Sequence, residues 1–429
     1  MANILAVNGG EKTRKALFER YNSIDNNEIE AVTDVMKSGV LSKYIGAWCD
    51  DFYGGDKTHE FEKLWGEKFD SKHTISVNSN TSGIIAALGA CGIGYGDEVI
   101  VSPYSMSISA TAPLVYNATP VFCDLNTNNY GFDIEHLKSL ITKNTKAIIV
   151  VHIFGIPSDM DEIMEIAKKH NIYVIEDCAQ APLATYKEKK VGTIGDIGIF
   201  SLNYHKHIHT GEGGMCVTNN DILANKLQLI RNHAESVVES KGDTDLVNML
   251  GFNFRLTELQ AAIGIEQLKK LDAEVILRQR YAKMYDDALS KYPFIKINKI
   301  EDRTISYYIQ VFEFLPDVAG ISRNTFIEAI KAELEVVKGR ENEGVPIYEG
   351  YVKPLYLIPM FQKRLVYTKE NFCFKDEIEY KIGTCPNVEE LENKKLWNHD
   401  FTRAPLTLDD INDIINAYKK VCDNIDELK

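Results

Sequence analysis

The sequence has no CxxC pair, no compact cysteine framework and no low-complexity tract. Its eight cysteines are scattered, mostly in apolar text such as PVFCDL and GMCVTN, so we interpret them as buried reduced thiols. No apolar run reaches the length of a membrane span, and the first fifteen residues, MANILAVNGGEKTRK, lack the apolar core of an export signal. These absences exclude a disulfide scaffold and predict a cytoplasmic protein.

Basic residues are also too few to balance the acidic ones. Lysine and arginine total 48, aspartate and glutamate total 62, and the net charge of −14 disfavours nucleic acid and anionic membranes as partners. An anionic substrate would therefore have to be held by hydrogen-bond donors at its own binding site, because the overall charge of the chain does not attract it. With 45% apolar and 26% charged residues the chain has the composition of a globular protein, which excludes a mainly disordered chain.

Seven short β-rich runs alternate with helical or turn-rich text between residues 73 and 218. They read HTISVNS, DEVIVSP, TPVFCDL, KAIIVVHIFG, IYVIEDCA, IGIFSL and GMCVTN. Runs that are apolar throughout indicate strands buried on both faces, as in a largely parallel α/β sheet. A crossover helix is expected between the fourth and fifth runs, and a long helix from Thr257. We predict an N-terminal arm (1–25), a large α/β domain (26–270) and a small α+β domain (271–429).

The segment FSLNYHKHIHTGEGG, residues 200–214, places three histidines around one lysine. On an extended strand His205, His207 and His209 would share a face, as a metal site requires. However, the chain has no HExxH motif, and any carboxylate ligand would have to come from far along the sequence. We therefore predict no metal, and we expect the three histidines to face a substrate.

Two glycine-containing or polar turns are candidates for phosphate binding. GIGYGDE, residues 92–98, precedes a strand, whereas a dinucleotide-binding loop must follow one, so we interpret it as a plain turn. VNSNTSGIIAALGA has the required order, with Thr81 and Ser82 at the expected start of a helix. Phosphate binding and simple helix capping both favour such residues, and the pattern does not separate them.

Further polar residues are expected at the carboxyl ends of strands, where ligands gather in sheets of this kind. Glu176 and Asp177 end the run IYVIED, and Lys206 follows IGIFSL just before the turn TGEGG. Pyridoxal phosphate (PLP) is held by three such groups: a lysine amine, a carboxylate, and a helix N-terminus that can bind the phosphate. The lysine forms a Schiff base with the cofactor aldehyde, the carboxylate keeps the pyridine nitrogen protonated, and backbone donors bind the phosphate.

These motifs resemble those of the DegT/StrS family of PLP-dependent sugar aminotransferases, from about residue 25 to the C-terminus. FSLNYHKHIHTGEGGMCVTNN is similar to the family's Schiff-base segment, which implies that Lys206 carries the cofactor and that Ser201 binds its phosphate. EDCAQA is similar to the ring-binding motif, which implies that Asp177 pairs with the pyridinium and that Gln180 lies beside the ring. The resemblance implies a fold-type-I aminotransferase with a seven-stranded sheet.

Two further segments carry the resemblance. SNTSG matches the family's phosphate turn at Thr81 and Ser82. GFNFRLTELQAAIGIEQL resembles the segment that reaches the cofactor of a neighbouring subunit. The resemblance implies that Asn253 makes this contact, with Arg255 as the alternative. The resemblance therefore implies a homodimer with shared active sites.

The chain departs from the family pattern at two positions. Met106 stands where the family usually stacks an aromatic ring on the cofactor, and a thioether also packs on a π face. Pro182 stands where many members have a histidine, so any role of that histidine is absent. Some relatives replace the lysine by histidine and dehydrate sugars instead, but Lys206 remains in register here.

The resemblance implies transfer of an amino group from L-glutamate or L-glutamine to the ketone of a nucleotide-linked deoxysugar. The segment EGVPIYEGYVKPLYLIPMFQ is similar to the branch that acts on cyclitols, so a cyclitol or free sugar-acid ketone is the alternative acceptor. A PLP-dependent sugar dehydratase is a second alternative. A non-catalytic PLP-binding regulator is disfavoured, because Lys206 is present and no basic DNA-binding extension is seen.

Overall fold

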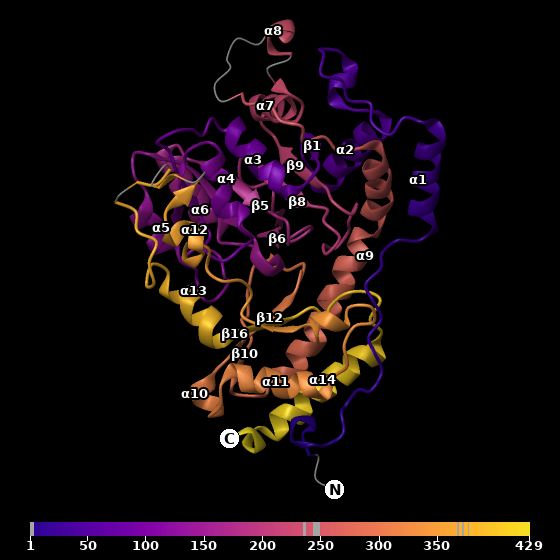
Figure 1. The fold of residues 1–429 in the computed structure, drawn as a ribbon, viewed down its shortest axis with the longest axis vertical. Coiled ribbons are helices and arrows are strands. Elements are labelled where there is room, and N and C mark those ends of the chain that lie inside the picture. The colour runs from indigo at the N-terminus through magenta and orange to yellow at the C-terminus, as the bar shows by residue number, and fades with distance from the viewer. Residues whose placement is uncertain (1–3, 235–236, 243–248, 367–368, 371–372, 376) are drawn as a thin grey trace.

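The computed structural model describes residues 4–234, 237–242, 249–366, 369–370, 373–375 and 377–429. Figure 1 shows an elongated molecule with a large α/β layer at one end. A smaller group of helices and strands lies at the other end, close to both termini. None of the helices in these ranges is long and apolar enough to cross a membrane.

The large layer is built on a seven-stranded sheet with the order β1-β9-β8-β5-β4-β2-β3. Its strands are β1 (His73–Val77), β2 (Glu98–Val101), β3 (Thr119–Phe122), β4 (Thr145–Val151), β5 (Tyr173–Asp177), β8 (Ile197–Ser201) and β9 (Gly214–Thr218). Every neighbouring pair is parallel except the two pairs that β9 makes with β1 and β8. The structure thus confirms the predicted α/β fold with a mostly parallel sheet.

Both faces of this sheet are covered, which explains why its strands are apolar throughout. Along β4, Ile149 and Val151 belong to one apolar core, whereas Ile148 and Val150 belong to the core on the opposite face. Helices α3 (Asn80–Ala90), α4 (Ile108–Val115) and α7 (Asp221–Arg231) contribute to the first core. Helices α2 (Asp56–Phe69), α5 (Ile134–Leu140) and α6 (Met160–His170) contribute to the second. Helix α6 is the predicted crossover helix.

Helix α9 (Glu258–Leu289) connects the two ends of the molecule (Figure 1). It begins at a capping box in which Thr257 and Gln260 satisfy each other's backbone N–H groups. Beyond it, an antiparallel sheet with the order β10-β12-β16-β13 is formed by β10 (Ile295–Lys296), β12 (Gln310–Phe314), β13 (Ile347–Glu349) and β16 (Leu396–His399). A smaller α+β unit at the C-terminus therefore matches the expectation.

The N-terminal segment completes the core of this smaller unit. Leu5 and Phe18 are buried in the same apolar cluster as residues of α11 (Arg323–Glu333) and α14 (Leu408–Asp423). The predicted arm, residues 1–25, thus packs on the C-terminal unit, with residues 1–3 outside the described ranges. The predicted boundary at residue 270 falls inside the continuous helix α9, and the domain limits stay a prediction.

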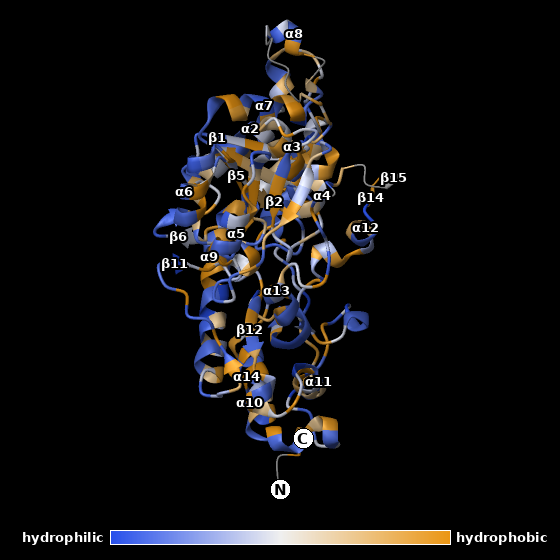
Figure 2. Cartoon of the chain, turned by 90° about the vertical axis from the view of Figure 1, so that its left-hand side faces the viewer, coloured by the Kyte–Doolittle hydropathy of each residue, from blue (hydrophilic) through white to orange (hydrophobic). Residues whose placement is uncertain are grey.

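The remaining elements are short or lie at the periphery. They are α1 (Asn26–Ser38), α8 (Val238–Lys241), α10 (Pro316–Ala319), α12 (Pro359–Gln362), α13 (Pro386–Glu390), β6 (Thr185–Tyr186), β7 (Lys189–Lys190), β11 (Arg303–Thr304), β14 (Leu365–Val366) and β15 (Lys369–Glu370). In Figure 2 the strands inside the large layer are mainly hydrophobic, whereas the outer helices mix hydrophobic and hydrophilic residues. The glycine-containing stretch at 92–98 is a turn between α3 and β2, as predicted.

Candidate active site

A cavity of about 360 Å³ opens where β5 and β8 end and α3 begins. The cavity is lined by seven of the residues singled out from the sequence: Thr81, Met106, Asp177, Gln180, Ser201, His205 and Lys206. They come from segments more than a hundred residues apart, and the parallel sheet brings them to one edge. Its size is that of a typical small-molecule site.

Lys206 lies on the loop that follows β8. Its Nζ is 4.1 Å from the centre of the Tyr308 ring, so an aromatic face covers the amine on one side. Burial lowers the pKa of Lys206 to about 8, with the Asp177 carboxylate opposing this shift and the charge of Arg278 adding to it. A larger share of the amine is therefore neutral near pH 7 than in a solvated lysine, as a nucleophile requires.

Asp177 ends β5 and is buried. Its Oδ1 accepts hydrogen bonds from the Asn80 side-chain amide and from the backbone N–H of Ala179, both at 3.1 Å. Burial raises the pKa of Asp177, while these two donors and the charge of Lys206 work in the opposite direction. Because both hydrogen bonds go to Oδ1, the second oxygen is available to a cationic N–H group in the cavity.

The start of α3 forms one wall of the cavity. The Ser79 side chain caps the helix by accepting from the backbone N–H of Ser82. Thr81 and Ser79 line the cavity, whereas the Ser82 hydroxyl donates to Asn78 at 2.6 Å and lies outside the lining. A Cβ on Gly214 would come within 2.7 Å of the backbone of Ser79 and the next residue, so the glycine of TGEGG permits this close approach.

Gln180 is held in one orientation. Its Oε1 accepts from the backbone N–H of Phe154 at 2.6 Å, and its Nε2 donates to the Tyr351 hydroxyl at 2.9 Å. Tyr351 and Tyr308 both line the cavity and both come from the C-terminal unit. Neither tyrosine is a candidate from the sequence: Tyr308 lies in none of the motifs, and Tyr351 lies in the segment at 343–362, which indicates only the class of acceptor.

Three predicted cofactor contacts occupy different surroundings. Met106 is 57% exposed at the edge of the cavity, where a side chain can cover one face of a planar ligand. Asn253 and Arg255 do not line the cavity of their own chain. Arg255 donates from Nε to the Asn232 side chain, next to a backbone bridge between Asn232 and Asn253. Their predicted contact with a neighbouring subunit stays a prediction.

The three histidines do not share one face. Residues 202–213 form a loop of turns rather than the extended strand on which a shared face would depend. His205 lines the cavity, and its pKa is lowered to about 4 by burial and by the charges of Arg403 and Arg340. His207 is buried, with Nε2 2.9 Å from the carbonyl of Ser306. Its position gives no support to a substrate contact.

His209 faces a second, neighbouring cleft. Its backbone N–H donates to the Gln267 side chain at 3.3 Å, which ties the loop to α9. Burial lowers the pKa of His209, with smaller contributions from nearby charges. His205 lines this second cleft as well, so two of the three predicted histidines meet there.

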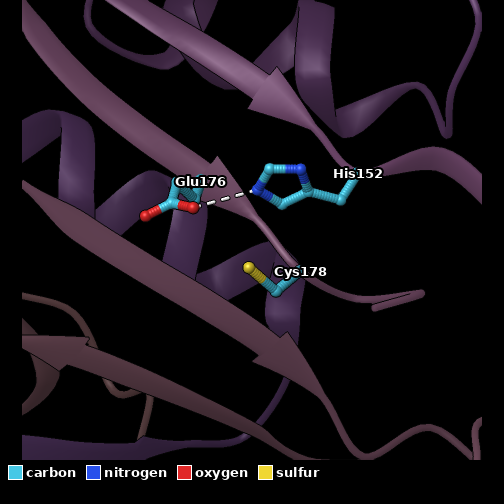
Figure 3. A group of neighbouring side chains, drawn as sticks. All are labelled: His152, Glu176 and Cys178. Atoms are coloured by element: carbon cyan, nitrogen blue, oxygen red, sulfur yellow. Dashed lines mark hydrogen bonds and ion pairs between the residues drawn. The ribbon is translucent and has the colours of Figure 1, made fainter. Parts of the chain in front are cut away.

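One buried group has the residue types of a metal site, namely His152, Glu176 and Cys178 (Figure 3). However, Glu176 accepts four hydrogen bonds: from His152 Nε2 and from the backbone N–H groups of Gly192, Ile194 and Gly195. His152 Nδ1 accepts from the backbone N–H of Ser158 at 3.1 Å, so Nε2 is the protonated nitrogen. Since the carboxylate oxygens of Glu176 and both ring nitrogens of His152 are already hydrogen-bonded, the group serves as a structural brace next to Asp177.

Most cysteines are buried reduced thiols, as predicted from the sequence. All eight cysteines are free, and six of them are buried. The exceptions are Cys49, which is exposed, and Cys91, which is partly buried. The six buried cysteines therefore belong to the packing of the fold, as interpreted from the sequence.

A mostly parallel sheet with a lysine and a carboxylate at adjacent strand ends defines a fold-type-I aminotransferase. The model of the DegT/DnrJ/EryC1/StrS aminotransferase family matches residues 22–398, and the chain belongs to this family. It is therefore an aminotransferase of the sugar and cyclitol class, as predicted from the sequence.

Three relatives illustrate the range of the family. The chain is 32% identical over 94% of its length to the spore coat polysaccharide biosynthesis protein SpsC of Bacillus subtilis, covering 96% of it. It is 39% identical over 62% of its length to GDP-perosamine synthase of Caulobacter vibrioides, covering 68% of that protein. It is 30% identical over 98% of its length to L-glutamine:2-deoxy-scyllo-inosose aminotransferase of Streptomyces lividus, covering 98%.

A solved structure supports the fold along almost the whole chain. The aminotransferase from Psychrobacter cryohalolentis superposes with a TM-score of 0.80 at 31% identity. The match covers 95% of this chain and all of the other. The arrangement of sheet, long helix and C-terminal unit is therefore that of a known aminotransferase.

Proposed function

We propose that this protein is a PLP-dependent aminotransferase that moves an amino group from L-glutamate or L-glutamine to the keto group of a nucleotide-linked deoxysugar. The observation that carries the proposal is the common cavity of the Lys206 amine, the Asp177 carboxylate and the start of α3. Membership of a PLP-dependent family supports the choice of cofactor.

The residues of the cavity fit PLP. Lys206 would attach to the cofactor aldehyde, and Asp177 would bind the pyridinium N–H through its available oxygen. The side chains of Thr81 and Ser201 and the first backbone N–H groups of α3 would hold the phosphate. Ser82 would contribute indirectly, because the hydrogen bond from its backbone N–H to the Ser79 side chain fixes the start of α3. Gln180 and Met106 would flank the ring. When bound, PLP supplies an electron sink that stabilises negative charge on the carbon that carries the amino group.

The chain's own residues supply the proton chemistry. With a pKa of about 8, the Lys206 amine would accept a proton in its neutral form and donate it again, so it could move a proton beside the bound cofactor. Asp177 would stabilise positive charge on the ring nitrogen of the bound cofactor, and the interaction would be strong because Asp177 is buried. Tyr308 and Tyr351 cover the cavity from the C-terminal unit and restrict access of water.

A cyclitol or free sugar-acid ketone is the alternative acceptor, and one observation favours it. The relative that is 30% identical over nearly the whole chain carries a name that specifies a cyclitol ketone, 2-deoxy-scyllo-inosose. The match to GDP-perosamine synthase has a higher identity but covers less of the chain. A PLP-dependent sugar dehydratase would leave no new amine in its product, so detection of an amine in the product distinguishes an aminotransferase from a dehydratase.

We also propose a homodimer that shares its active sites. Exposed apolar side chains follow one another along α1 and the segment after it: Ile29, Met36, Val40, Leu41 and Ile45. Ile29 and Met36 are seven residues apart and thus lie on one face of α1, as a subunit interface would require. The eight free thiols are in keeping with a reducing compartment such as the cytoplasm.

The visible absorbance of the protein with PLP tests the proposed chemistry. We expect a band of bound cofactor that depends on Lys206 and disappears when L-glutamate or L-glutamine is added. The variant Lys206→Ala should bind PLP without this band and show no response to either donor. Bound cofactor that responds to neither donor in the unmodified protein would contradict transamination. If a donor does remove the band, a panel of nucleotide-linked and cyclitol ketones then identifies the acceptor.

A further inference from the structure

A second cleft adjoins the cofactor cavity, and its volume is about 710 Å³. His205 lines both spaces, so the cleft lies directly outside the proposed reaction centre. Three arginines line it, Arg20, Arg340 and Arg403, and we call it the arginine cleft. It is also lined by His209 and by a single carboxylate, that of Glu343.

The arginine cleft is positively charged although the chain as a whole carries −14. Arg340 pairs with Glu343, and Arg403 pairs with Asp400. Arg20 makes no ion pair with any residue that the structure describes. One guanidinium is thus uncompensated, and each of the other two keeps N–H groups that its single carboxylate does not occupy.

The histidine between the two spaces reports the same positive field. After burial, the charges of Arg403, Arg340 and Lys206 are the next causes that lower the pKa of His205, to about 4, and Glu343 alone opposes them. His205 therefore stays neutral near pH 7 and acts as a hydrogen-bonding group rather than as a further cation. Guanidinium groups arranged around one cleft are the usual donors for phosphate.

We propose that the arginine cleft binds the phosphate groups of the acceptor, with Arg20, Arg340 and Arg403 as their ligands. This inference rests on the proposed function and deepens it, because it selects a phosphate-bearing acceptor over a neutral cyclitol ketone. The keto sugar then reaches past His205 toward Lys206, while the phosphates remain in the outer cleft.

The amino donor is a less suitable occupant on chemical grounds. Its α-carboxylate is bonded to the same carbon as the amino group that must reach the cofactor, so that carboxylate lies inside the inner cavity. The side chain of L-glutamine carries no charge that could use the outer arginines, and L-glutamate offers them one carboxylate, which occupies fewer guanidinium N–H groups than a diphosphate does. A phosphate joined to the far side of a sugar ring has both the charge and the reach.

Calorimetric titration of the PLP-loaded protein with inorganic pyrophosphate, and with uridine, guanosine and thymidine diphosphates, tests the proposal. We expect Arg20→Gln, Arg340→Gln and Arg403→Gln each to weaken binding of these probes by about tenfold. Glu343→Gln removes the only carboxylate in the lining and should tighten binding severalfold. Arg280→Gln, an exposed arginine of α9 outside the lining, is the matched control and should change nothing.

Two results would overturn the proposal. One is an absence of pyrophosphate and nucleotide binding in the unmodified protein. The other is a set of cleft variants that weaken the response of the bound cofactor to L-glutamate or L-glutamine but leave pyrophosphate binding unchanged, since the arginines would then serve the donor. The exposed Arg20 and the opposite sign expected for Glu343→Gln keep the test decisive even if Arg403→Gln folds poorly.

The proposed function fails or survives in a separate measurement. The absorbance change with L-glutamate or L-glutamine depends on Lys206 and not on the cleft arginines. A protein that transaminates but ignores pyrophosphate would refute only the arginine cleft. A protein that binds pyrophosphate but shows no donor response would refute the transamination and leave the cleft in place.

Discussion

At the scale of single residues, the chemistry of Lys206 depends on its surroundings. A solvated lysine is almost fully protonated at pH 7, whereas burial gives Lys206 a pKa of about 8. The neutral amine is then about one part in ten at pH 7, compared with roughly one in three thousand for a lysine that titrates near 10.5. The larger fraction of neutral amine results from the protein surroundings alone and does not require bound cofactor.

The first prediction concerns the rate at which PLP attaches to the cofactor-free protein. Because only the neutral amine reacts, we expect the rate to rise about tenfold per pH unit below pH 8 and to level off above it. Stopped-flow absorbance between pH 6 and 10 measures this profile. N-acetyl-lysine amide is the reference, and its rate should keep rising to about pH 10. A protein profile that follows the reference would contradict the low pKa.

The sequence was sufficient to place some active-site residues and not others. Lys206 and Asp177 lie at strand ends within recognisable motifs, and the cavity contains both. Tyr308 and Tyr351 lie about 100 or more residues further along, outside the motifs that bind the cofactor, and reach the cavity only because the C-terminal unit folds over it. His207 on the loop at 202–213 is buried with its Nε2 at the Ser306 carbonyl, and its predicted substrate contact stays a prediction.

At the scale of elements, the brace behind Asp177 joins strands β4 and β5 to the loop before β8. Glu176 is fully buried, and its two oxygens accept four hydrogen bonds. In Glu176→Gln an NH₂ group would face two of these donors. We expect a loss of about 2–4 kcal/mol in the free energy of unfolding. Urea unfolding of the cofactor-free protein measures it.

The control for this substitution is Glu162→Gln on the exposed face of α6, which should change stability by less than about 0.5 kcal/mol. Equal stabilities of the two variants would show that the brace contributes nothing. A metal bound by His152, Glu176 and Cys178 would predict a different result, namely destabilisation of the unmodified protein by a chelator.

The cap of α3 gives a second prediction at this scale. Ser79 accepts the backbone N–H of Ser82 at the helix end that faces the cavity. Ser79→Ala should lower the free energy of unfolding by about 1 kcal/mol, whereas Ser79→Thr should retain most of the cap. Denaturant unfolding of the three proteins decides the point. A threonine variant as unstable as the alanine variant would indicate that packing, and not the cap, fixes this helix start.

The elements of the large sheet were predictable because their physics is local. A strand buried on both faces must be apolar throughout, and β4 alternates between two cores residue by residue. The C-terminal unit gave weaker signals, since its strands are short and antiparallel, and several span only two residues. Their partners are far along the chain, so no local pattern specifies the pairing.

At the scale of the whole molecule, the active site of one chain is built from distant parts. The N-terminal segment and the C-terminal helices share one core, and α9 joins that core to the large sheet. Asn253 and Arg255 remain outside their own cavity, although their segment resembles one that reaches a cofactor. These facts lead to the proposal that each complete site requires two chains.

Mixing two inactive variants tests this shared site. Lys206→Ala removes the amine, and Asn253→Ala combined with Arg255→Ala removes the segment's contacts. If the sites are shared, random exchange makes half of the dimers mixed, and each mixed dimer has one intact site, so about a quarter of the activity should return. Activity after co-refolding of equal amounts is the measurement, with each variant refolded alone as the control. No recovery, although co-purification of two differently tagged chains shows mixed dimers, would place Lys206 and the Asn253 segment in the same site of one chain.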